Sequence, residues 1–424
     1  MTSRLMSHAG VVFGTGGESP IARGEAPETK ECEAGVMSPV STGSPGPRVL
    51  LDATGVPADR GGIGRYVDGL VSALAAAGQD LVVVCQRSDA ERFTRTAGNA
   101  VILPGPSAIS HRPARLAWEQ TGLPLIAQQV GADLIHSPYY TMPLHAPVPV
   151  VVTVHDVTFF SEPELYSAVR TGFYRSATRT AVRRAARVVV PSMATRDELV
   201  RLLDADPRQI DVVRHGVDLE TFHPPTEVEA RRASDRLGLH GRPYVAFLGV
   251  LDRRKNVPDL VRGWARAVDG LDEPPVLVLA GSSGWDDGVD QACAEVPPHL
   301  KVVRPGFLRP SDLPGLLGGA MVVAYPSTAE GFGLPVLEAM ACGAAVLTVR
   351  RLSLPEVGGD AVAYTEPDAE SIAESLRALI LDPERRVALS EAGKERAKQF
   401  PWGASAQAHL ETYRRAAAPQ TVSV

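Results

Sequence analysis

The sequence predicts an α/β protein in which two doubly wound domains face each other across a cleft. Short apolar runs rich in β-branched residues alternate with helical patterns from Val49 onward, which indicates parallel sheets covered on both faces. This rhythm breaks once, over 224–243, and then restarts. The chain of 424 residues is long enough for two domains, each with a core of its own.

The first 47 residues are set apart by their composition. They are rich in Gly, Ser, Pro and Glu, show little periodicity and end in SPVSTGSPGP. Such a stretch cannot bury enough apolar surface to offset the entropy lost on ordering. We therefore expect a disordered tail over 1–47, with Met37 as an alternative start of the protein.

An N-terminal domain is predicted over 48–223. Its first strand is followed by a glycine turn and a helix, and a long helix is expected near 165–186. The expected strands occupy 49–53, 81–85, 101–103, 133–137, 150–156, 188–192 and 211–216.

Prolines and charges over 224–243 predict an interdomain linker, and a C-terminal domain is predicted over 244–399. Residues 400–424 are predicted to form a C-terminal helix that packs back toward the N-terminal domain, followed by a tail. Ligands of such sheets bind beyond the carboxyl ends of the strands, so the motifs placed there form the candidate site. The expected strands are 244–249, 276–281, 321–327 and 345–349, with helices near 256–269, 285–294, 311–318 and 334–342.

Composition argues against several classes of protein. The formal net charge of −6 gives no overall attraction to nucleic acid or to anionic membranes. Cys32, Cys85, Cys293 and Cys342 lack the spacing of a metal cage or a disulfide framework, which fits a reducing cytoplasm. No apolar run approaches the roughly 20 residues that span a bilayer, and no secretory signal is evident. We expect a cytoplasmic protein without a metal site.

A glycine-rich turn, PADRGGIGRY at 57–66, follows the first strand. Gly61, Gly62 and Gly64 would let the backbone approach a ligand, and the start of the next helix attracts phosphate through its free amides. The alternative is an ordinary tight turn, which this motif alone favours. The pattern is not GxGxxG, and no acidic residue suited to a nicotinamide ribose is evident, so a dehydrogenase is not expected.

Two further motifs follow strands. GVLDRRKN at 249–256 places Arg253, Arg254 and Lys255 just before a helix, where cations oppose the helix dipole. A bound diphosphate would offset this cost, since Arg and Lys bind phosphate oxygens. A solvated charge cluster is the alternative. HDVTFF at 155–160 ends a strand with His155, which would either bond a sugar hydroxyl or pack as a structural residue.

The most informative stretch is EGFGLPVLEAMACG, which begins at Glu330. Glu330 precedes a glycine turn whose amides, at Gly331 and Gly333, would point at a ligand. A helix is expected from about Leu334, with a proline allowed in its first turn. Glu338 lies within this mostly apolar helix. A buried carboxylate needs partners, which ribose hydroxyls would supply.

With these motifs the chain resembles the retaining glycosyltransferases of family four, which have the GT-B fold of two Rossmann-like domains facing a cleft. The resemblance extends over 49–416 and includes WEQTGLP, LIHSPYY, VVVPS, RHGVD, SLPEVGGDA and FPW. Within the family the sequence is most similar to bacterial mannosyltransferases that build polysaccharides or glycolipids. The resemblance implies transfer of a hexose from a nucleotide diphosphate to a hydroxyl acceptor, with retained anomeric configuration.

The resemblance implies catalytic roles for four residues. Glu330 would hold hydroxyls of the donor sugar, and His155 would contact the transferred sugar near the reacting carbon. Lys255, helped by Arg254, would neutralise the diphosphate.

The resemblance implies donor-binding roles for a larger set. Glu338 would bind the ribose. Val250 stands where many relatives carry an arginine, so Arg253 or Arg254 would replace that charge. The other implied positions are Gly62 or Gly64 on the diphosphate and acceptor side, Phe307 and Leu308 beside the base, and the turn of Gly331, Phe332, Gly333 and Leu334.

The implied reaction needs no metal and no cofactor, because cations and amides would stabilise the leaving diphosphate. Similarity to the mannosyltransferases implies GDP-mannose as the nucleotide-sugar donor. The alternatives left open are a transferase that uses a UDP-sugar, an epimerase-like enzyme, and a non-catalytic protein of the same fold.

A series of arginines bears on the partners. They recur on the helix expected near 165–186, with no acidic residue between Leu165 and Arg196. On a helix they form a basic stripe, which predicts peripheral contact with the inner face of the plasma membrane or with a lipid-linked acceptor. A solvated surface helix is the alternative, and no nucleic-acid partner is expected. The stripe consists of Arg170, Arg175, Arg179, Arg183, Arg184 and Arg187.

Overall fold

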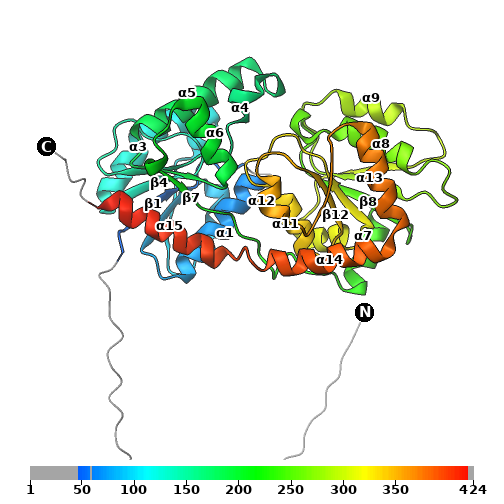
Figure 1. Cartoon of the computed structure of the whole chain (residues 1–424). Coiled ribbons are helices and arrows are strands. Elements are labelled where there is room, and N and C mark those ends of the chain that lie inside the picture. The colour runs from blue at the N-terminus through cyan, green and yellow to red at the C-terminus, as the bar shows by residue number, and fades with distance from the viewer. Residues whose placement is uncertain (1–45, 58–59, 419–424) are drawn as a thin grey trace, which may run out of the picture. The chain divides into compact units, whose positions relative to one another are not determined.

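The computed structural model describes residues 46–57 and 60–418, which contain two parallel β-sheets (Figure 1). The first sheet has seven strands in the order β3-β2-β1-β4-β5-β6-β7. We call residues 46–223 the N-terminal half. The tail predicted over 1–47 lies outside the described residues except for its last two positions. The strands are β1 (Val49–Asp52), β2 (Leu81–Cys85), β3 (Val101–Pro104), β4 (Leu134–Ser137), β5 (Val150–Thr153), β6 (Arg187–Val190) and β7 (Ile210–Val212).

The second sheet has six strands in the order β10-β9-β8-β11-β12-β13, and we call residues 224–399 the C-terminal half. The sequence pattern does not predict β10, which contains an arginine and a proline, or β13, which has only three residues. The predicted α/β class with two doubly wound parallel sheets is confirmed. The strands are β8 (Tyr244–Leu248), β9 (Val276–Ala280), β10 (Val302–Gly306), β11 (Val322–Tyr325), β12 (Val346–Val349) and β13 (Ala363–Thr365).

Helices cover the sheets of both halves (Figure 1). None of those within the described residues is long and apolar enough to cross a membrane. In the N-terminal half they are α1 (Gly62–Ala76), α2 (Ala90–Thr96), α3 (Arg112–Gln129), α4 (Thr158–Ser161), α5 (Ala168–Arg184) and α6 (Met193–Leu203). The later helices are α7 (Glu227–Arg236), α8 (Val257–Ala267), α9 (Gly288–Ala294), α10 (Leu313–Gly318), α11 (Leu334–Ala341), α12 (Leu354–Gly358), α13 (Ala369–Leu381), α14 (Pro383–Ala397) and α15 (Trp402–Ala417).

The segment predicted as a linker, 224–243, contains helix α7, which the prolines and charges obscure in the sequence. A capping box starts this helix. The amide of Glu229 donates to the Thr226 hydroxyl at 3.3 Å, and the Thr226 amide donates to the Glu229 carboxylate at 2.8 Å. Leu237 and Leu239, which follow α7, are buried in the core of the C-terminal half.

Both faces of the first sheet are buried, which explains its continuous apolar strands. Leu51 and Val83 belong to a core shared with α1 and α15. Their neighbours Leu50, Val82 and Val84 point to a second core on the opposite face. A sheet covered in this way exposes only its strand ends, so ligand-binding side chains come from the loops there.

Helix α15 packs against α1 and carries buried polar residues into the N-terminal half (Figure 1). His409 Nδ1 lies 2.8 Å from the carbonyl oxygen of Ser405, which can only accept, so Nδ1 carries the ring hydrogen. His409 Nε2 must then accept a hydrogen bond from the hydroxyl of Tyr66, at 3.0 Å. Burial lowers the pKa of His409 to about 4, which keeps the ring neutral.

These hydrogen bonds continue through the sheet. The Tyr66 oxygen accepts from Thr153 at 3.0 Å, and Thr153 accepts from Nε2 of His136 at 2.9 Å. His136 Nδ1 accepts in turn from the Tyr413 hydroxyl at 2.8 Å. A second hydrogen on the ring of His136 or His409 would point at a hydroxyl that already donates to that ring. All of these hydrogen bonds can therefore form only while both histidines are neutral. We call the series Tyr413, His136, Thr153, Tyr66, His409 and Ser405 the buried hydrogen-bond chain.

The described chain passes between the two halves after β7 and again after α14. The two passages run side by side. The amide of Val217 donates to the carbonyl of Phe400 at 2.9 Å, and Val217 forms a parallel bridge with Pro401. Each passage is thereby fixed to the other.

Candidate active site

A cavity of about 430 Å³ opens beyond the carboxyl ends of strands from both sheets. Loops that follow β1, β5, β8 and β11 border it, as expected for doubly wound sheets. Its volume is that of a small-molecule site. The predicted site residues that line it are Gly62, His155, Arg254, Lys255, Phe307, Glu330, Gly331, Phe332, Gly333 and Leu334.

Four predicted residues do not line the cavity. Glu338 is buried within α11. Arg253 points elsewhere and donates to the carbonyl of Glu164 at 3.5 Å. Gly64 lies inside α1, and Leu308 packs against the core of the C-terminal half.

Glu330 is the centre of a buried ion-pair cluster. Its Oε1 accepts hydrogen bonds from Lys255, Tyr325 and Ser327, the last two at 2.8 and 2.6 Å. Its Oε2 accepts from Arg254 at 3.0 Å. Burial alone would raise the pKa of Glu330, but Arg254 and Lys255 lower it to about 2. The carboxylate is therefore ionised at neutral pH and both of its oxygens are engaged by the protein.

The charges of this cluster balance. Arg254 Nε lies 3.5 Å from Oδ2 of Asp252, so two cations face two carboxylates, those of Asp252 and Glu330. Burial lowers the pKa of Lys255, and the charge of Arg254 lowers it further. A diphosphate that enters the cavity must compete with Glu330 for Lys255 and Arg254.

The glycine turn after Glu330 contacts the N-terminal half. The carbonyl of Gly331 accepts from the hydroxyls of Ser192 and Thr195 at 2.8 and 3.3 Å. A Cβ atom on Gly331 would lie 1.6 Å from the carbonyl oxygen of His155, so only glycine fits there. The two halves meet at this turn, beside the cavity.

We expect Gly331→Ala to lower transfer activity at least about 100-fold, which is roughly 3 kcal/mol of transition-state stabilisation. The new methyl group would overlap the backbone of His155, and no side-chain rotation relieves that overlap. The turn must therefore leave His155. Steady-state kinetics would measure the loss. Gly172→Ala is the control, because a Cβ at this exposed position in α5 meets nothing within 4 Å. Near-normal activity in Gly331→Ala would contradict the tight contact.

His155 is a neutral residue among aromatic rings. Its Nε2 lies 2.8 Å from the carbonyl of Pro138, so Nε2 carries the hydrogen. Burial lowers the pKa of His155 below its ordinary value of 6.5. Its ring meets Tyr66 edge-on, with centroids 5.0 Å apart. This tautomer leaves Nδ1 as an acceptor for a sugar hydroxyl.

Glu338 pairs with Arg65, a residue that the sequence motifs did not single out. Arg65 Nε lies 2.5 Å from Glu338 Oε1 and joins α1 of one half to α11 of the other. Burial raises the pKa of Glu338, and Arg65 opposes this rise. The second oxygen, Oε2, is buried with no partner among the described residues, and a ribose hydroxyl would satisfy it. The position of Arg65 in GGIGRY, directly after the glycine turn, is the signal in the sequence.

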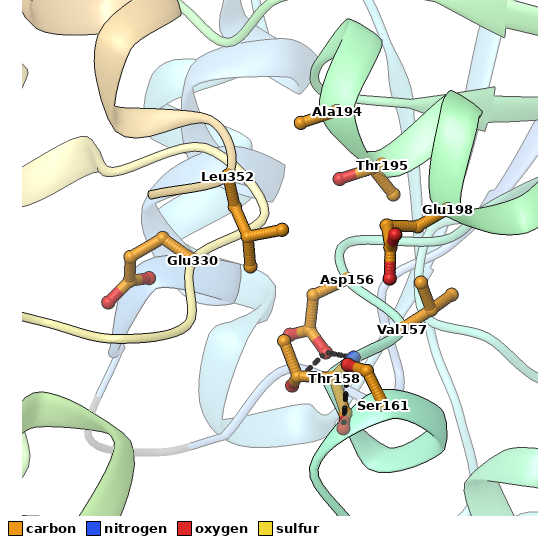
Figure 2. A pocket seen from close by; sticks show the side chains of 9 residues that line it. All are labelled: Asp156, Val157, Thr158, Ser161, Ala194, Thr195, Glu198, Glu330 and Leu352. Carbon is orange, nitrogen blue, oxygen red and sulfur yellow. Dashed lines mark hydrogen bonds between the residues drawn. The ribbon is translucent and has the colours of Figure 1, made fainter. Parts of the chain in front are cut away.

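A second, much smaller pocket adjoins the cavity, and Figure 2 shows the residues that line it. It measures about 10 Å³, which is room for one water molecule and not for a substrate. Asp156 and Glu330 line both spaces. Oδ1 of Asp156 accepts from the amide and the hydroxyl of Thr158 at 3.3 and 3.0 Å. The residues around this small pocket are Asp156, Val157, Thr158, Ser161, Ala194, Thr195, Glu198, Glu330 and Leu352.

An acidic pair that could suggest a metal site lies away from the cavity. Asp204 and Asp206 follow α6, and Asp206 is engaged by the amide and the guanidinium of Arg208, each at 2.9 Å. Neither aspartate lines the cavity. Across 46–57 and 60–418, no group of three or more His, Cys, Asp or Glu residues is placed to hold a metal ion.

Several arginines of the predicted basic stripe are engaged within the protein. Arg175 donates to two backbone carbonyls of α4 at 2.8 and 3.2 Å, and the guanidinium of Arg179 lies over the ring of Phe160. Arg187 pairs with Asp211 at 2.6 Å. Membrane contact stays a prediction, and it would depend on the exposed residues Arg179, Arg183 and Arg184.

The chain matches two family descriptions that together span most of its length. Residues 60–221 match Glycosyltransferase Family 4, and residues 231–396 match Glycosyl transferases group 1. A D-inositol 3-phosphate glycosyltransferase of Kineococcus radiotolerans is 33% identical, over 84% of this chain and 91% of the relative.

Solved structures share the fold. HepE of Anabaena, crystallised with UDP and glucose, superposes with a TM-score of 0.68 over 86% of this chain and 99% of its own, at 18% identity. Sucrose-phosphate synthase of Thermosynechococcus elongatus gives a TM-score of 0.69 over 87% of this chain and 98% of its own, at 22% identity. Two doubly wound sheets in this arrangement define the GT-B class. The chain belongs to the retaining glycosyltransferases of family four within that class.

Other relatives carry names that refer to different sugars. O-antigen chain mannosyltransferase B of Escherichia coli is 29% identical over 63% of this chain and 71% of the relative. Alpha-maltose-1-phosphate synthase of Mycolicibacterium smegmatis is 29% identical over 84% of this chain and 96% of the relative. The relatives therefore differ in the sugars to which their names refer.

Proposed function

We propose that the protein transfers mannose from GDP-mannose to a hydroxyl of a glycan, glycolipid or other acceptor. The observation that carries the transferase proposal is the convergence of Lys255, Arg254 and the glycine turn at one cavity. The choice of mannose is supported by the similarity to the Escherichia coli mannosyltransferase, and GDP is the nucleotide that the family resemblance implies for a mannosyl donor.

In the proposed reaction, the bond between the anomeric carbon and the diphosphate oxygen breaks while a bond to the acceptor oxygen forms on the same face. The acceptor proton passes to the leaving diphosphate. Lys255 and Arg254 stabilise the negative charge that develops on this leaving group, where preorganised cations are most effective. Neutral His155 accepts from a hydroxyl of the transferred sugar. These side chains supply the charge stabilisation, so we propose that the reaction needs no divalent metal.

A panel of GDP-, UDP-, ADP- and dTDP-sugars, tested with EDTA present, would examine the proposal. GDP-mannose at 100 times its dissociation constant should raise the unfolding free energy by about 2.7 kcal/mol. It should also be turned over. Glu338→Ala and Lys255→Ala should lose both responses, while Lys398→Ala, at an exposed lysine of the C-terminal half, should keep them. Stabilisation and turnover with UDP-sugars alone would show that GDP-mannose is not the donor. No stabilisation or turnover with any sugar nucleotide of the panel would contradict the proposed transferase function.

A further inference from the structure

We infer that the N-terminal side of the cavity is a subsite for an uncharged sugar ring, so that the acceptor is a saccharide and not a phosphorylated polyol or a sugar phosphate. This inference rests on the proposed function and concerns only the acceptor. We call the subsite the aromatic wall. It consists of Tyr139, Tyr140, Phe159, Tyr166 and Tyr174 of the N-terminal half, together with Trp285, which reaches it from the loop after β9.

The aromatic wall concentrates aromatic side chains in a chain that is only 5% aromatic. Its five rings from the N-terminal half contact one another in a series that begins at His155, whereas Trp285 stands outside this series. The centroid of Tyr140 lies 5.9 Å from that of His155 and 5.1 Å from that of Tyr174, and Phe159 lies 5.5 Å from Tyr174. A ligand on the wall would therefore reach the side of the cavity where His155 is expected to contact the transferred sugar.

The chemistry of the wall suits a pyranose. Aromatic faces carry partial negative charge and attract the C–H groups on one face of a sugar ring. The hydroxyls of Tyr139 and Tyr174 bond to each other, which uses one of their two hydrogens and leaves the other free to donate. The Tyr140 hydroxyl accepts from the amide of Asp156 at 3.1 Å, so its own hydrogen is also available.

Asp156 supplies the complementary acceptor. Its Oδ1 is bonded to Thr158, whereas Oδ2 makes no hydrogen bond with the described residues, and the side chain lines the cavity. A carboxylate in this position accepts hydrogen bonds from sugar hydroxyls and repels a phosphate. A site built to bond hydroxyls discriminates strongly among acceptors.

The cations of the cavity are already engaged. Arg65 pairs with Glu338, and Arg254 and Lys255 pair with carboxylates of the ion-pair cluster. Arg170 lies over the ring of Trp285, 4.5 Å from its centroid, and the indole of Trp285 donates to the carbonyl of Leu165 at 3.3 Å. Arg170 is therefore the one cavity-lining cation of the described residues that could serve an acceptor phosphate, which gives the test a discriminating variant.

Transfer to the methyl glycosides of mannose and glucose, compared with glucose 1-phosphate and myo-inositol 1-phosphate, would test the inference. We expect transfer to the neutral glycosides only. Asp156→Asn and Trp285→Ala should raise the KM for the glycoside about tenfold and leave the KM for the donor unchanged. Tyr364→Phe, at a half-buried tyrosine of the C-terminal half that does not line the cavity, is the control. The inference would be overturned if the enzyme preferred a phosphorylated acceptor and Arg170→Gln lost that preference. It would also be overturned if no neutral glycoside accepted the sugar.

Binding gives a second readout that does not depend on turnover. Trp285 is 39% exposed, so replacing it should not prevent folding and its fluorescence can report a bound ring. The neutral glycoside should change the fluorescence of the enzyme with nucleoside diphosphate bound, and Trp285→Phe should abolish that change. If the enzyme binds its donor but the glycoside does not change the fluorescence and the variants of the aromatic wall do not change the KM for the glycoside, the inference about the acceptor is wrong and the proposed function stands. Failure to bind any donor overturns the proposed function instead.

Discussion

Glu330→Gln is expected to bind nucleoside diphosphate about tenfold more tightly than the wild-type enzyme, a difference of roughly 1.4 kcal/mol, while transferring sugar at least about 100-fold more slowly. In the wild type, Glu330 engages both Lys255 and Arg254, so an arriving diphosphate must displace a carboxylate. The neutral amide removes this competitor. It also removes the group that positions both cations, which accounts for the slower chemistry.

The same substitution should lower the stability of the protein in the absence of nucleotide. Removing one partner of a buried pair leaves uncompensated charge, which costs roughly 3–5 kcal/mol of unfolding free energy. Added nucleoside diphosphate should recover much of the lost free energy of unfolding. Calorimetric titration and denaturant unfolding, each with and without the nucleotide, would measure both effects. Glu395→Gln, which removes one partner of an exposed pair with Lys398, is the control. Unchanged or weaker nucleotide binding in Glu330→Gln would show that Glu330 does not compete with the diphosphate for Lys255 and Arg254.

Acid should destabilise the protein between pH 6.5 and pH 5, before most carboxylates titrate. The folded pKa of His409 is about 4, below the ordinary value of 6.5 expected in the unfolded chain, because the ring is buried. The unfolded state therefore takes up a proton first as the pH falls, and stability present above pH 6.5 is lost. At pH 5 the loss from His409 alone is about 2 kcal/mol. Burial also lowers the pKa of His136 and His215 well below the ordinary value, so both add to the loss.

Denaturant unfolding at pH 7.5, 6 and 5 would measure this effect. Buried Glu119 and Glu338 have raised pKa values and act in the opposite sense, so the contribution of one histidine needs a variant. His409→Gln should be less stable than the wild type at pH 7.5 and should lose less stability on acidification. His299→Gln, at an exposed position, should keep the full dependence on pH. Equal slopes for His409→Gln and the wild type would contradict the neutral state of the buried hydrogen-bond chain.

The fold class could be predicted because both sheets are buried on both faces, which turns their strands into continuous apolar runs. Strand β13 is too short for such a signal, and the arginine and proline of β10 disguise it. Most site motifs could be placed because the carboxyl ends of parallel strands lie together. The pairing of Arg65 with Glu338 could not be predicted from the sequence, because it depends on how α1 of one half packs against α11 of the other. Arg253 and Leu308 miss the cavity because strand periodicity does not determine the conformation of the loop beyond a strand.

The paired passages at Val217 and Phe400 have a mechanical consequence. Two backbone segments tied by a hydrogen bond resist twisting more than a single segment would, so we expect relative motion of the two halves to be confined largely to one axis. We expect the cavity to open for the donor by rotation of one half about these paired passages. Distances between fluorescent labels on the two halves should accordingly change along a single coordinate when nucleotide binds.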